Sequence, residues 1–423
     1  MKDPFIFQLF ARLIHKGQLS LCIGIFDRDQ AWTASGKEEG RTVNITLSSQ
    51  GDLWPMIFRP EMGIAEAYMD GRLCLADTSI DDFIIFLFDN KQALSVTKFG
   101  RFFNYIVQIK AFLKSAIGRR MAQRNVSHHY DIKDDLYELF LDHRRQYSCG
   151  YFLSPHDDIH TAQIQKIARI AAKLKLKDDA RTLDIGCGWG ELSYALSTLE
   201  NNIFTHGITL SKNQWDYACK KVASRAPSQV HFSLQDYRDE HQKYDHIVSV
   251  GMIEHVGHKA LNDYCKVISR CLEETGTALL HFIGKRRASK GHSPFINKYI
   301  FPGGYIPTLA DMTSALSKTD LHITDVECWH NHYAETLRQW RLRCETHKEH
   351  IISTFDKRFW RMWLFYLVSC EYFFRLDEGV VYQIQLAKTR DVTPSTRYYI
   401  AEKEKNYTKK LWQQNKLFGN QPP

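Results

Sequence analysis

The sequence predicts an α/β protein whose main domain is a doubly wound parallel sheet, preceded by a small α+β domain. Three observations lead to this prediction. From about residue 126, strand-like and helix-like runs alternate at the spacing of a parallel sheet with crossover helices. Within that region, residues 181–192 (RTLDIGCGWGEL) form an apolar run that ends in an acid and three alternate glycines. Residues 1–92 instead carry short runs separated by glycine and aspartate turns.

The N-terminal region, residues 1–92, is expected to be a compact α+β domain. Strand-like runs are expected at residues 43–47 and 54–59, and helix-like runs at residues 63–69 and 80–88. No group of polar side chains suited to catalysis stands out in it.

Residues 93–125 are expected to form a basic amphipathic linker helix. The stretch from residue 91 to residue 124 holds eight Lys or Arg residues and no Asp or Glu, which equals the net charge of +8 of the whole chain. Apolar residues recur along it at helical spacing. They are Phe99, Phe102, Phe103, Ile106, Ile109 and Leu113. Such a helix suits an anionic membrane surface. The alternative is a linker helix whose apolar stripe packs on a neighbouring element.

Residues 126–392 are expected to form the catalytic domain. Besides the strand that ends at Asp184, strands are expected near residues 203–205, 230–234, 246–250, 278–282 and 380–388. Helices are expected at residues 161–176, 192–199, 212–224, 259–271 and within 335–376. Ligands of such sheets bind beyond the carboxyl ends of the strands. The remaining residues, 393–423, are expected to form a basic C-terminal tail with a helix.

The glycine turn after Asp184 indicates the cofactor. Gly186, Gly188 and Gly190 allow backbone conformations in which a ligand lies directly against the chain. A nicotinamide-binding turn would need a third glycine where Glu191 stands. The pattern instead resembles motif I of the class I S-adenosylmethionine-dependent methyltransferases, which have a Rossmann-like fold and an acid near the charged amino-acid end of the cofactor.

Composition excludes several classes of protein. The ten cysteines form no C-x-x-C pair, so we expect reduced thiols and no metal site. No uncharged apolar run of about 18 residues is present, so we expect a cytoplasmic protein that associates peripherally with a membrane. The net positive charge is compatible with a membrane, a phosphorylated substrate or a nucleic acid.

Seven segments, in order, resemble the cyclopropane-fatty-acyl-phospholipid synthase family, which includes the mycolic acid methyltransferases. They are HYDIKDDLYELFLD, QYSCGYF, LDIGCGWGEL, GITLSKNQ, VGMIEHVG, LLHFIG and YIFPGGYIP, between residues 129 and 307. The resemblance extends over residues 126–390. In the front domain, RPEMGIAEAYMDG looks like the lipid-binding extension of the full-length bacterial synthases.

The resemblance implies roles for individual residues. The residues expected to hold S-adenosylmethionine are Tyr147, Ser148, Asp184, Gly186, Gly188, Gly190, Thr209, Gln214, Asp236 and Tyr237. The family's bicarbonate site maps onto Cys149, Glu254, His281, Ile283 and Tyr333. Glu254, His281 and a tyrosine hydroxyl are the kinds of group that can hold this anion, and backbone N–H groups of Cys149 and Ile283 would complete the site. Plain alternatives are a helix cap for Glu254 and a buried core histidine for His281.

The sequence therefore predicts an enzyme that adds a methylene from S-adenosylmethionine across the cis double bond of unsaturated phospholipid acyl chains in the bilayer. Such a reaction passes through a carbocation, which needs a base and protection from water. Alternatives are a lipid methyltransferase that closes no ring, a non-catalytic lipid-binding protein, and a nucleic-acid methyltransferase. We expect no nucleic-acid partner, and the oligomeric state stays open, with a homodimer as one option.

Overall fold

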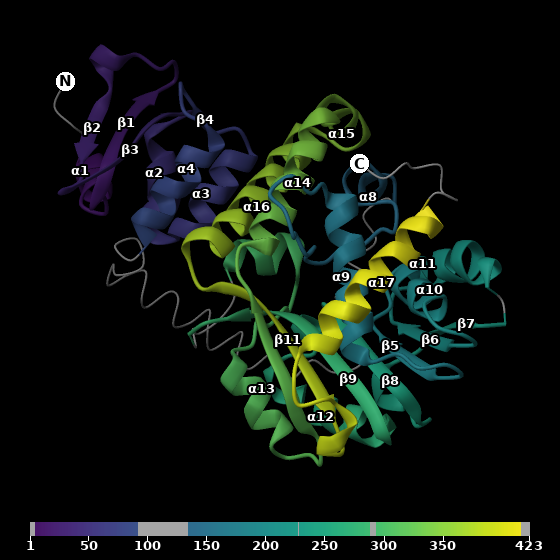
Figure 1. The fold of residues 1–423 in the computed structure, drawn as a ribbon. Coiled ribbons are helices and arrows are strands. Elements are labelled where there is room, and N and C mark those ends of the chain that lie inside the picture. Colours follow the sequence, from purple (N-terminus) through teal and green to yellow (C-terminus); the bar gives the residue numbers. More distant parts are fainter. Residues whose placement is uncertain (1–4, 92–133, 227, 288–292, 416–423) are drawn as a thin grey trace. The chain divides into compact units, whose positions relative to one another are not determined.

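The computed structural model describes residues 5–91, 134–226, 228–287 and 293–415 (Figure 1). These residues divide into two compact units, which we treat separately. Unit 1 comprises the described residues within Met1–Lys114, Lys290–Ile300 and Trp340–Asp377. Unit 2 comprises those within Ser115–Ser289, Phe301–Gln339 and Glu378–Pro423. The predicted linker helix at residues 93–125 lies outside the described residues.

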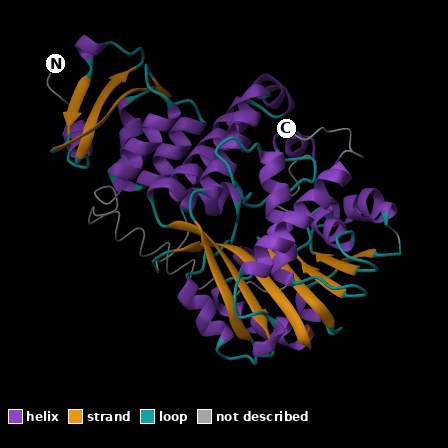
Figure 2. Ribbon diagram, in the orientation of Figure 1, coloured by secondary structure: helices purple, strands orange, loops and turns teal. Residues whose placement is uncertain are grey.

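Unit 1 combines a small sheet with a layer of helices (Figure 2). Its strand order is β2-β1-β3-β4. The strands are β1 (Lys16–Ile23), β2 (Trp32–Ser35), β3 (Glu38–Leu47) and β4 (Leu73–Leu75). The helices are α1 (Phe5–Ala11), α2 (Leu53–Phe58), α3 (Pro60–Met69), α4 (Ile80–Asp89), α15 (Lys348–Thr354) and α16 (Lys357–Leu376). The aromatic helix α16 packs against α3 and α4, so most of its apolar residues are part of the core of this unit.

The expectation of a strand at residues 54–59 is wrong, because residues 54–58 belong to α2 and Arg59 caps its C-terminus. Leu53 and Met56 are buried at a spacing of three residues, and Trp54 stacks on Phe58 four residues later. Both spacings are those of a helix. Pro55 in the first turn needs no N–H donor there, whereas in a strand it would remove one ladder hydrogen bond.

Unit 2 is built on a seven-stranded sheet of order β10-β11-β9-β8-β5-β6-β7. The strands are β5 (Arg181–Ile185), β6 (Phe204–Thr209), β7 (Val230–Leu234), β8 (Tyr244–Val250), β9 (Leu272–Lys285), β10 (His322–Trp329) and β11 (Gly379–Ala387). Strands β9, β8, β5, β6 and β7 are parallel, and β11 lies antiparallel between β9 and β10. The predicted doubly wound α/β fold is confirmed.

Helices cover both faces of this sheet. The helices of unit 2 include α8 (Asp134–Phe140), α9 (Ile159–Leu174), α10 (Glu191–Ser197), α11 (Lys212–Tyr217), α12 (Leu261–Cys271), α13 (Leu309–Leu316) and α17 (Tyr398–Asn415). A further helix, α14 (His332–Thr346), begins in this unit. Apolar residues of α9, α10 and α17 share one core cluster, and those of α12 and α13 share another. The C-terminal segment that the sequence sets apart as a tail thus contributes α17 to this unit, packed along α9 (Figure 1).

The described residues also bear on membrane spans and on metal binding. None of the helices in the described part of the chain is both long and apolar enough to cross a membrane. Among the same residues, no group of three or more His, Cys, Asp or Glu side chains is arranged to hold a metal ion.

Candidate active site

The order of the sheet reverses between β5 and β8, and the glycine turn lies at this point. From β5 the chain order runs outward through β6 and β7 on one side, and β8 and β9 follow on the other. The connections that follow β5 and β8 therefore run in opposite directions along the sheet. This opens a crevice at the carboxyl ends of these two strands. Because Asp184 is near the end of β5 and Gly186 follows it, both are placed at this crevice.

All three glycines of the turn adopt a left-handed backbone conformation, and two of them have different structural roles. All three have positive φ, at 83° for Gly186, 55° for Gly188 and 86° for Gly190. A Cβ on Gly190 would lie 2.4 Å from the Phe232 ring, so this glycine permits close packing of the turn on the sheet. A Cβ on Gly188 would meet only Gln214 Nε2, at 3.9 Å, so its backbone borders open space.

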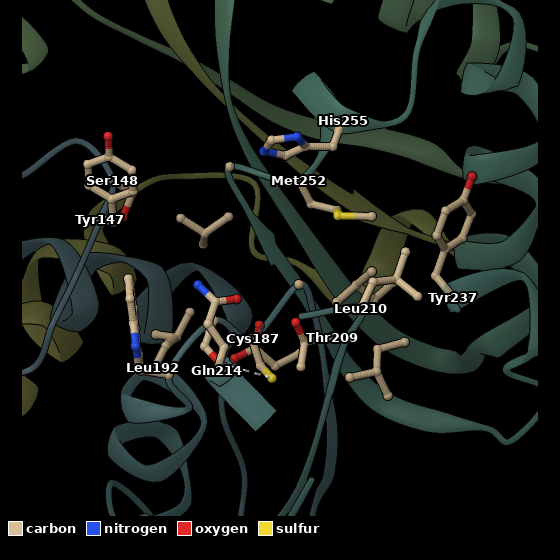
Figure 3. Close-up of a pocket in the computed structure, with 18 of the residues that line it drawn as sticks. Tyr147, Ser148, Cys187, Leu192, Thr209, Leu210, Gln214, Tyr237, Met252 and His255 are labelled. Atoms are coloured by element: carbon tan, nitrogen blue, oxygen red, sulfur yellow. Dashed lines mark hydrogen bonds between the residues drawn. The ribbon is translucent and has the colours of Figure 1, made fainter. Parts of the chain in front are cut away.

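A pocket lies above the turn (Figure 3). Most of the residues predicted to hold the cofactor line it, and they come from widely separated segments. They are Tyr147, Ser148, Asp184, Gly186, Gly188, Thr209, Gln214 and Tyr237. Figure 3 shows Tyr147 and Ser148 on one side of the pocket and Tyr237 on the other, with Thr209 and Gln214 between them. The structure thus brings together eight of the positions expected at the cofactor.

Two predicted cofactor residues are placed elsewhere. Gly190 is at the start of α10 and shapes the turn without lining the pocket. Asp236 is buried, and its carboxylate accepts hydrogen bonds from the Arg238 guanidinium at 2.7 and 2.8 Å. Its neighbours Gln235 and Tyr237 line the pocket instead. A contact between the Asp236 carboxylate and the cofactor therefore remains a prediction.

Asp184 is held as a buried acid at the base of the pocket. One of its oxygens accepts a hydrogen bond from Ser193 Oγ at 2.7 Å. Burial raises the pKa of this carboxyl to about 7, and the Ser193 hydrogen bond and the charge of Lys166 oppose the rise. A cationic ligand group next to Asp184 would favour the ionised form. The site therefore suits the ammonium of an amino acid.

The residues 142–150 form a strap over the pocket that contains Tyr147 and Ser148. The Tyr147 ring packs edge-on against Tyr137 of α8 at 5.5 Å. On the other side, Gln163 Nε2 of α9 donates to the Ser148 carbonyl oxygen at 2.8 Å. The strap is therefore anchored by two helices, which positions its pocket-facing residues.

Glu254 lies just beyond the cofactor pocket, on the short turn Ile253–His255 that follows β8. This turn is adjacent to β9, because the N–H of Gly251 donates to the carbonyl oxygen of His281 at 2.9 Å. Oε1 of Glu254 accepts the Ile283 N–H at 2.6 Å, whereas its Oε2 is buried without a hydrogen-bond partner among the described residues. Burial raises the pKa of Glu254 to about 7. A half-protonated carboxyl with one unpaired oxygen can donate to an anion as well as accept from a donor.

His281 is a buried neutral imidazole. Burial lowers its pKa well below the usual value, and the charges of Lys166 and Lys173 add to this effect. Its Nδ1 lies 3.1 Å from Gln383 Nε2 on β11, and Trp329 packs edge-on against its ring at 5.0 Å. With the amide assigned so that its NH₂ faces Nδ1, the proton of the imidazole is on Nε2, which makes that nitrogen a donor.

Of the remaining residues of the predicted anion site, Cys149 is part of the strap and Tyr333 is on α14, which contacts the strap. The buried Cys149 thiol donates to the Gly150 carbonyl oxygen at 3.2 Å, and burial raises its pKa, which keeps it protonated. Tyr333 is half-buried in the first turn of α14. Thr336, one turn further, accepts the Gly150 N–H at 2.9 Å, so the start of α14 is attached to the strap. The Ile283 N–H is engaged by Glu254, and its role toward an added anion remains a prediction.

The structure also reveals residues that sequence reasoning missed. Met252 and His255 line the pocket, and burial lowers the pKa of His255 to about 4. Lys166 and Gln383 are completely buried behind the site. Among these residues the sequence offers a usable signal only for Lys166, which is a charged residue within an Ile- and Ala-rich helix. Gln383 gave none, because only strand pairing brings it opposite His281.

Comparison with known proteins identifies the family. Residues 118–384 match the family model described as mycolic acid cyclopropane synthetase. The chain belongs to this family. A probable fatty acid methyltransferase of Pseudomonas putida is 34% identical over 64% of this chain and 70% of its own length. The cyclopropane-fatty-acyl-phospholipid synthase of Escherichia coli K12 is 36% identical over 62% of this chain and 66% of its own length, just under two thirds. Cyclopropane mycolic acid synthase 3 of Mycobacterium tuberculosis is 32% identical over 62% and 96%.

Solved structures of the same family agree with the fold. The cyclopropane synthase MmaA2 from Mycobacterium tuberculosis superimposes with a TM-score of 0.60 at 31% identity, covering 63% of this chain and 98% of that one. Mycolic acid cyclopropane synthase CmaA1, solved with SAH and CTAB, gives 0.58 at 30% identity, covering 62% and 97%. This synthetase-family chain is an S-adenosylmethionine-dependent methyltransferase, as the motif at Asp184 predicts. The buried carboxylate and the open glycine turn in its pocket fit that cofactor.

Proposed function

We propose that this enzyme transfers a methylene from S-adenosylmethionine across the cis double bond of unsaturated phospholipid acyl chains and forms a cyclopropane ring, with a bound bicarbonate as the base. The observation that carries the proposal is the position of Glu254. Its Oε2 is buried without a hydrogen-bond partner among the described residues. The next residue in the chain, His255, lines the cofactor pocket. An acid in this place, with the neutral His281 nearby on β9, suits removal of a proton beside the transferred carbon.

The cofactor supplies an electrophilic methyl group when it is bound. The chain's own residues orient it: the backbone at Gly188 allows close approach, and Asp184 is suited to its ammonium. Apolar side chains such as Val250 and Met252 line the pocket next to the turn. They exclude water from the site, which protects a carbocation on the acyl chain from being trapped.

Glu254 and His281 would hold the bicarbonate, and Cys149, Ile283 and Tyr333 are the further members that we propose. Near neutral pH a Glu254 carboxyl with its pKa at about 7 can place a proton on Oε2 and donate to the anion. His281 can donate from Nε2 because Gln383 faces Nδ1. Two such donors favour an anion over water in a buried site. The bicarbonate supplies a base that takes the proton lost when the ring closes.

We further propose that the substrate lies in a membrane and that the enzyme works as a peripheral protein on its cytoplasmic face. Support comes from the family, whose named members act on fatty acyl and mycolic acid chains. The stretch 91–124 carries eight basic residues and no acidic one in sequence, which supplies attraction to an anionic surface. A homodimer remains compatible with these features.

A second candidate is methyl transfer to an acyl chain without ring closure. It is favoured by the two relatives named as a probable fatty acid methyltransferase and as a tuberculostearic acid methyltransferase, each 34% identical to this chain. The two reactions share the cofactor and the cation and differ in the fate of the cation. In cyclopropanation the cation loses a proton from the new methyl group and closes.

Mass spectrometry of phospholipids from cells that express the enzyme distinguishes the candidates. We expect acyl chains that gain the mass of one CH₂ group and lose their double bond, with no uptake of hydrogen. A gain of CH₂ plus two hydrogens, or of CH₂ with the double bond retained, would contradict ring formation. Cells that express a Glu254→Gln variant are the matched control and should show unmodified chains.

A further inference from the structure

Lys166 is a buried cation behind the strap, and the proposed mechanism gives it no task. It lies in the middle of α9 with no exposed surface. Its Nζ donates to Ser148 Oγ at 2.8 Å and to Gln146 Oε1 at 2.8 Å. Burying an ammonium is costly unless its charge is compensated. The nearest acids are Asp142 and Asp184, and neither forms an ion pair with it within 4 Å in the described structure.

The charge is not required to hold the strap in place. Gln163 Nε2 already donates to the Ser148 carbonyl oxygen, and Asp142 Oδ1 accepts the Gln146 N–H at 2.7 Å. These bonds fix the backbone on both sides of Tyr147. A neutral donor at position 166 would suffice for the remaining contacts. The positive charge of Lys166 therefore points to a ligand group that needs a cation at this place.

The hydrogen bond from Lys166 determines what Ser148 can do. An ammonium group has three donors and no acceptor, so Ser148 Oγ must accept from it. The hydroxyl proton of Ser148 then points away from Lys166, and Ser148 lines the pocket. A hydroxyl that accepts from a cation is polarised and becomes a stronger donor. Ser148 thus offers the pocket a donor that suits an anionic group.

S-adenosylmethionine carries one anionic group, the carboxylate of its methionine end. The ammonium of the same end suits Asp184, another wall of the same pocket. Arg145 also lines the pocket, but its guanidinium lies 4.2 Å above the Tyr217 ring and pairs with Glu138. We propose that Lys166, acting through the Ser148 hydroxyl, is the positioning residue that selects the carboxylate of the cofactor. This inference rests on the cofactor assigned above and is independent of the lipid substrate.

Calorimetric binding of two product-like ligands tests this role without turnover. S-adenosylhomocysteine has the amino-acid end, and 5′-methylthioadenosine lacks it. For Lys166→Met we expect the affinity for S-adenosylhomocysteine to fall about ten- to a hundredfold, and that for 5′-methylthioadenosine to change less than about twofold. Ser148→Ala should cause the same selective loss, and it keeps the buried helix intact if Lys166→Met folds poorly.

Lys173→Met is the matched control. Lys173 lies two turns along the same helix, is equally buried, and pairs with Asp325 and Glu327 away from the strap. Its replacement should lower the unfolding temperature and leave the ratio of the two affinities unchanged. If Lys166→Met and Ser148→Ala each weaken the binding of both ligands equally, or of neither, the proposed role of Lys166 is overturned. The assignment of the cofactor would still stand. Failure of the unchanged enzyme to bind S-adenosylhomocysteine would overturn the proposed cofactor as well.

Discussion

Glu254 has two carboxylate oxygens in different surroundings. Oε1 is satisfied by the Ile283 N–H, and Oε2 is buried without a partner among the described residues. The pKa of about 7 is above the usual value, so the folded protein binds more protons than the unfolded chain between about pH 4.5 and pH 7. The contribution of Glu254 to stability is therefore greatest below about pH 4.5 and is lost as the pH rises through 7. The residue therefore destabilises the fold above about pH 7, as active-site groups often do.

Replacing Glu254 by glutamine should stabilise the protein and abolish ring formation. The amide keeps an oxygen for the Ile283 N–H and removes the buried charge. We expect the free energy of unfolding at pH 8 to rise by about 2–3 kcal/mol. At pH 4.5 and below the gain should disappear, because the wild-type carboxyl is then protonated. Urea denaturation at both pH values measures this difference.

Glu274→Gln is the control, because Glu274 is on the same strand as Ile283, its side chain is 73% exposed, and a glutamine oxygen can still accept the hydrogen bond from Lys388 Nζ. Its replacement should change the free energy of unfolding little at either pH. If Glu254→Gln lowers stability at pH 8, or changes it equally at both pH values, burial of a charge at this site is refuted.

At the scale of elements, the turn between β5 and α10 joins packing to ligand binding. Gly190 has φ of 86° and lies against Phe232 of β7, while Gly188 of the same turn borders the pocket. Gly190→Ala would place a Cβ within 2.4 Å of the Phe232 ring. We expect it to lower the free energy of unfolding by about 2–4 kcal/mol, through overlap added to a strained φ. It should also weaken binding of S-adenosylhomocysteine, measured by calorimetry.

Gly24→Ala separates the two causes. Gly24 has φ of 81°, and a Cβ there would meet nothing within 4 Å. It should therefore cost only the strain of the left-handed conformation, about 1–2 kcal/mol. Equal losses for the two variants would contradict the close packing on Phe232.

The elements of unit 2 were largely predictable because their signals are local. The strand at residues 230–234 agrees with β7, and the helix expected at residues 161–176 overlaps α9. In unit 1 some of the predicted helices and strands agree with the structure and others do not. A six-residue apolar run around Pro55 has no clear period by itself, and α2 was predicted as a strand. The short strand β2 alternates weakly and was not foreseen.

At the scale of the whole molecule, the charge of the chain is unevenly distributed. The stretch from residue 91 to residue 124 carries as many positive charges as the entire excess. Apart from Lys91, which pairs with Asp377, this stretch lies outside the described residues. Clustered basic residues attract anionic lipid, and salt screens that attraction.

Neutralising this segment should weaken activity on anionic vesicles. Replacing four of its basic residues by glutamine, Lys98, Arg101, Lys110 and Lys114, should lower activity on vesicles rich in phosphatidylglycerol about tenfold or more, since each contributes roughly 1 kcal/mol near a charged surface. Activity on detergent-dispersed lipid should be unchanged. Unaltered activity on anionic vesicles would favour the linker-helix interpretation. Replacing four exposed lysines of unit 2 by glutamine, Lys220, Lys221, Lys405 and Lys409, is the control for loss of charge alone.

The sequence by itself determined the family and the fold class, and eight of the ten residues that it assigns to the cofactor line one pocket. These depend on short segments at strand ends, and the carboxyl ends of parallel strands meet at one edge wherever the strands pair. Tertiary structure decided how the individual groups are paired. Lys166 is buried behind Ser148, and Gln383 meets His281 from 102 residues away. The pairing of Gln383 follows from strand register and that of Lys166 from helix packing, which join distant parts of the chain and leave no periodic trace in either partner alone.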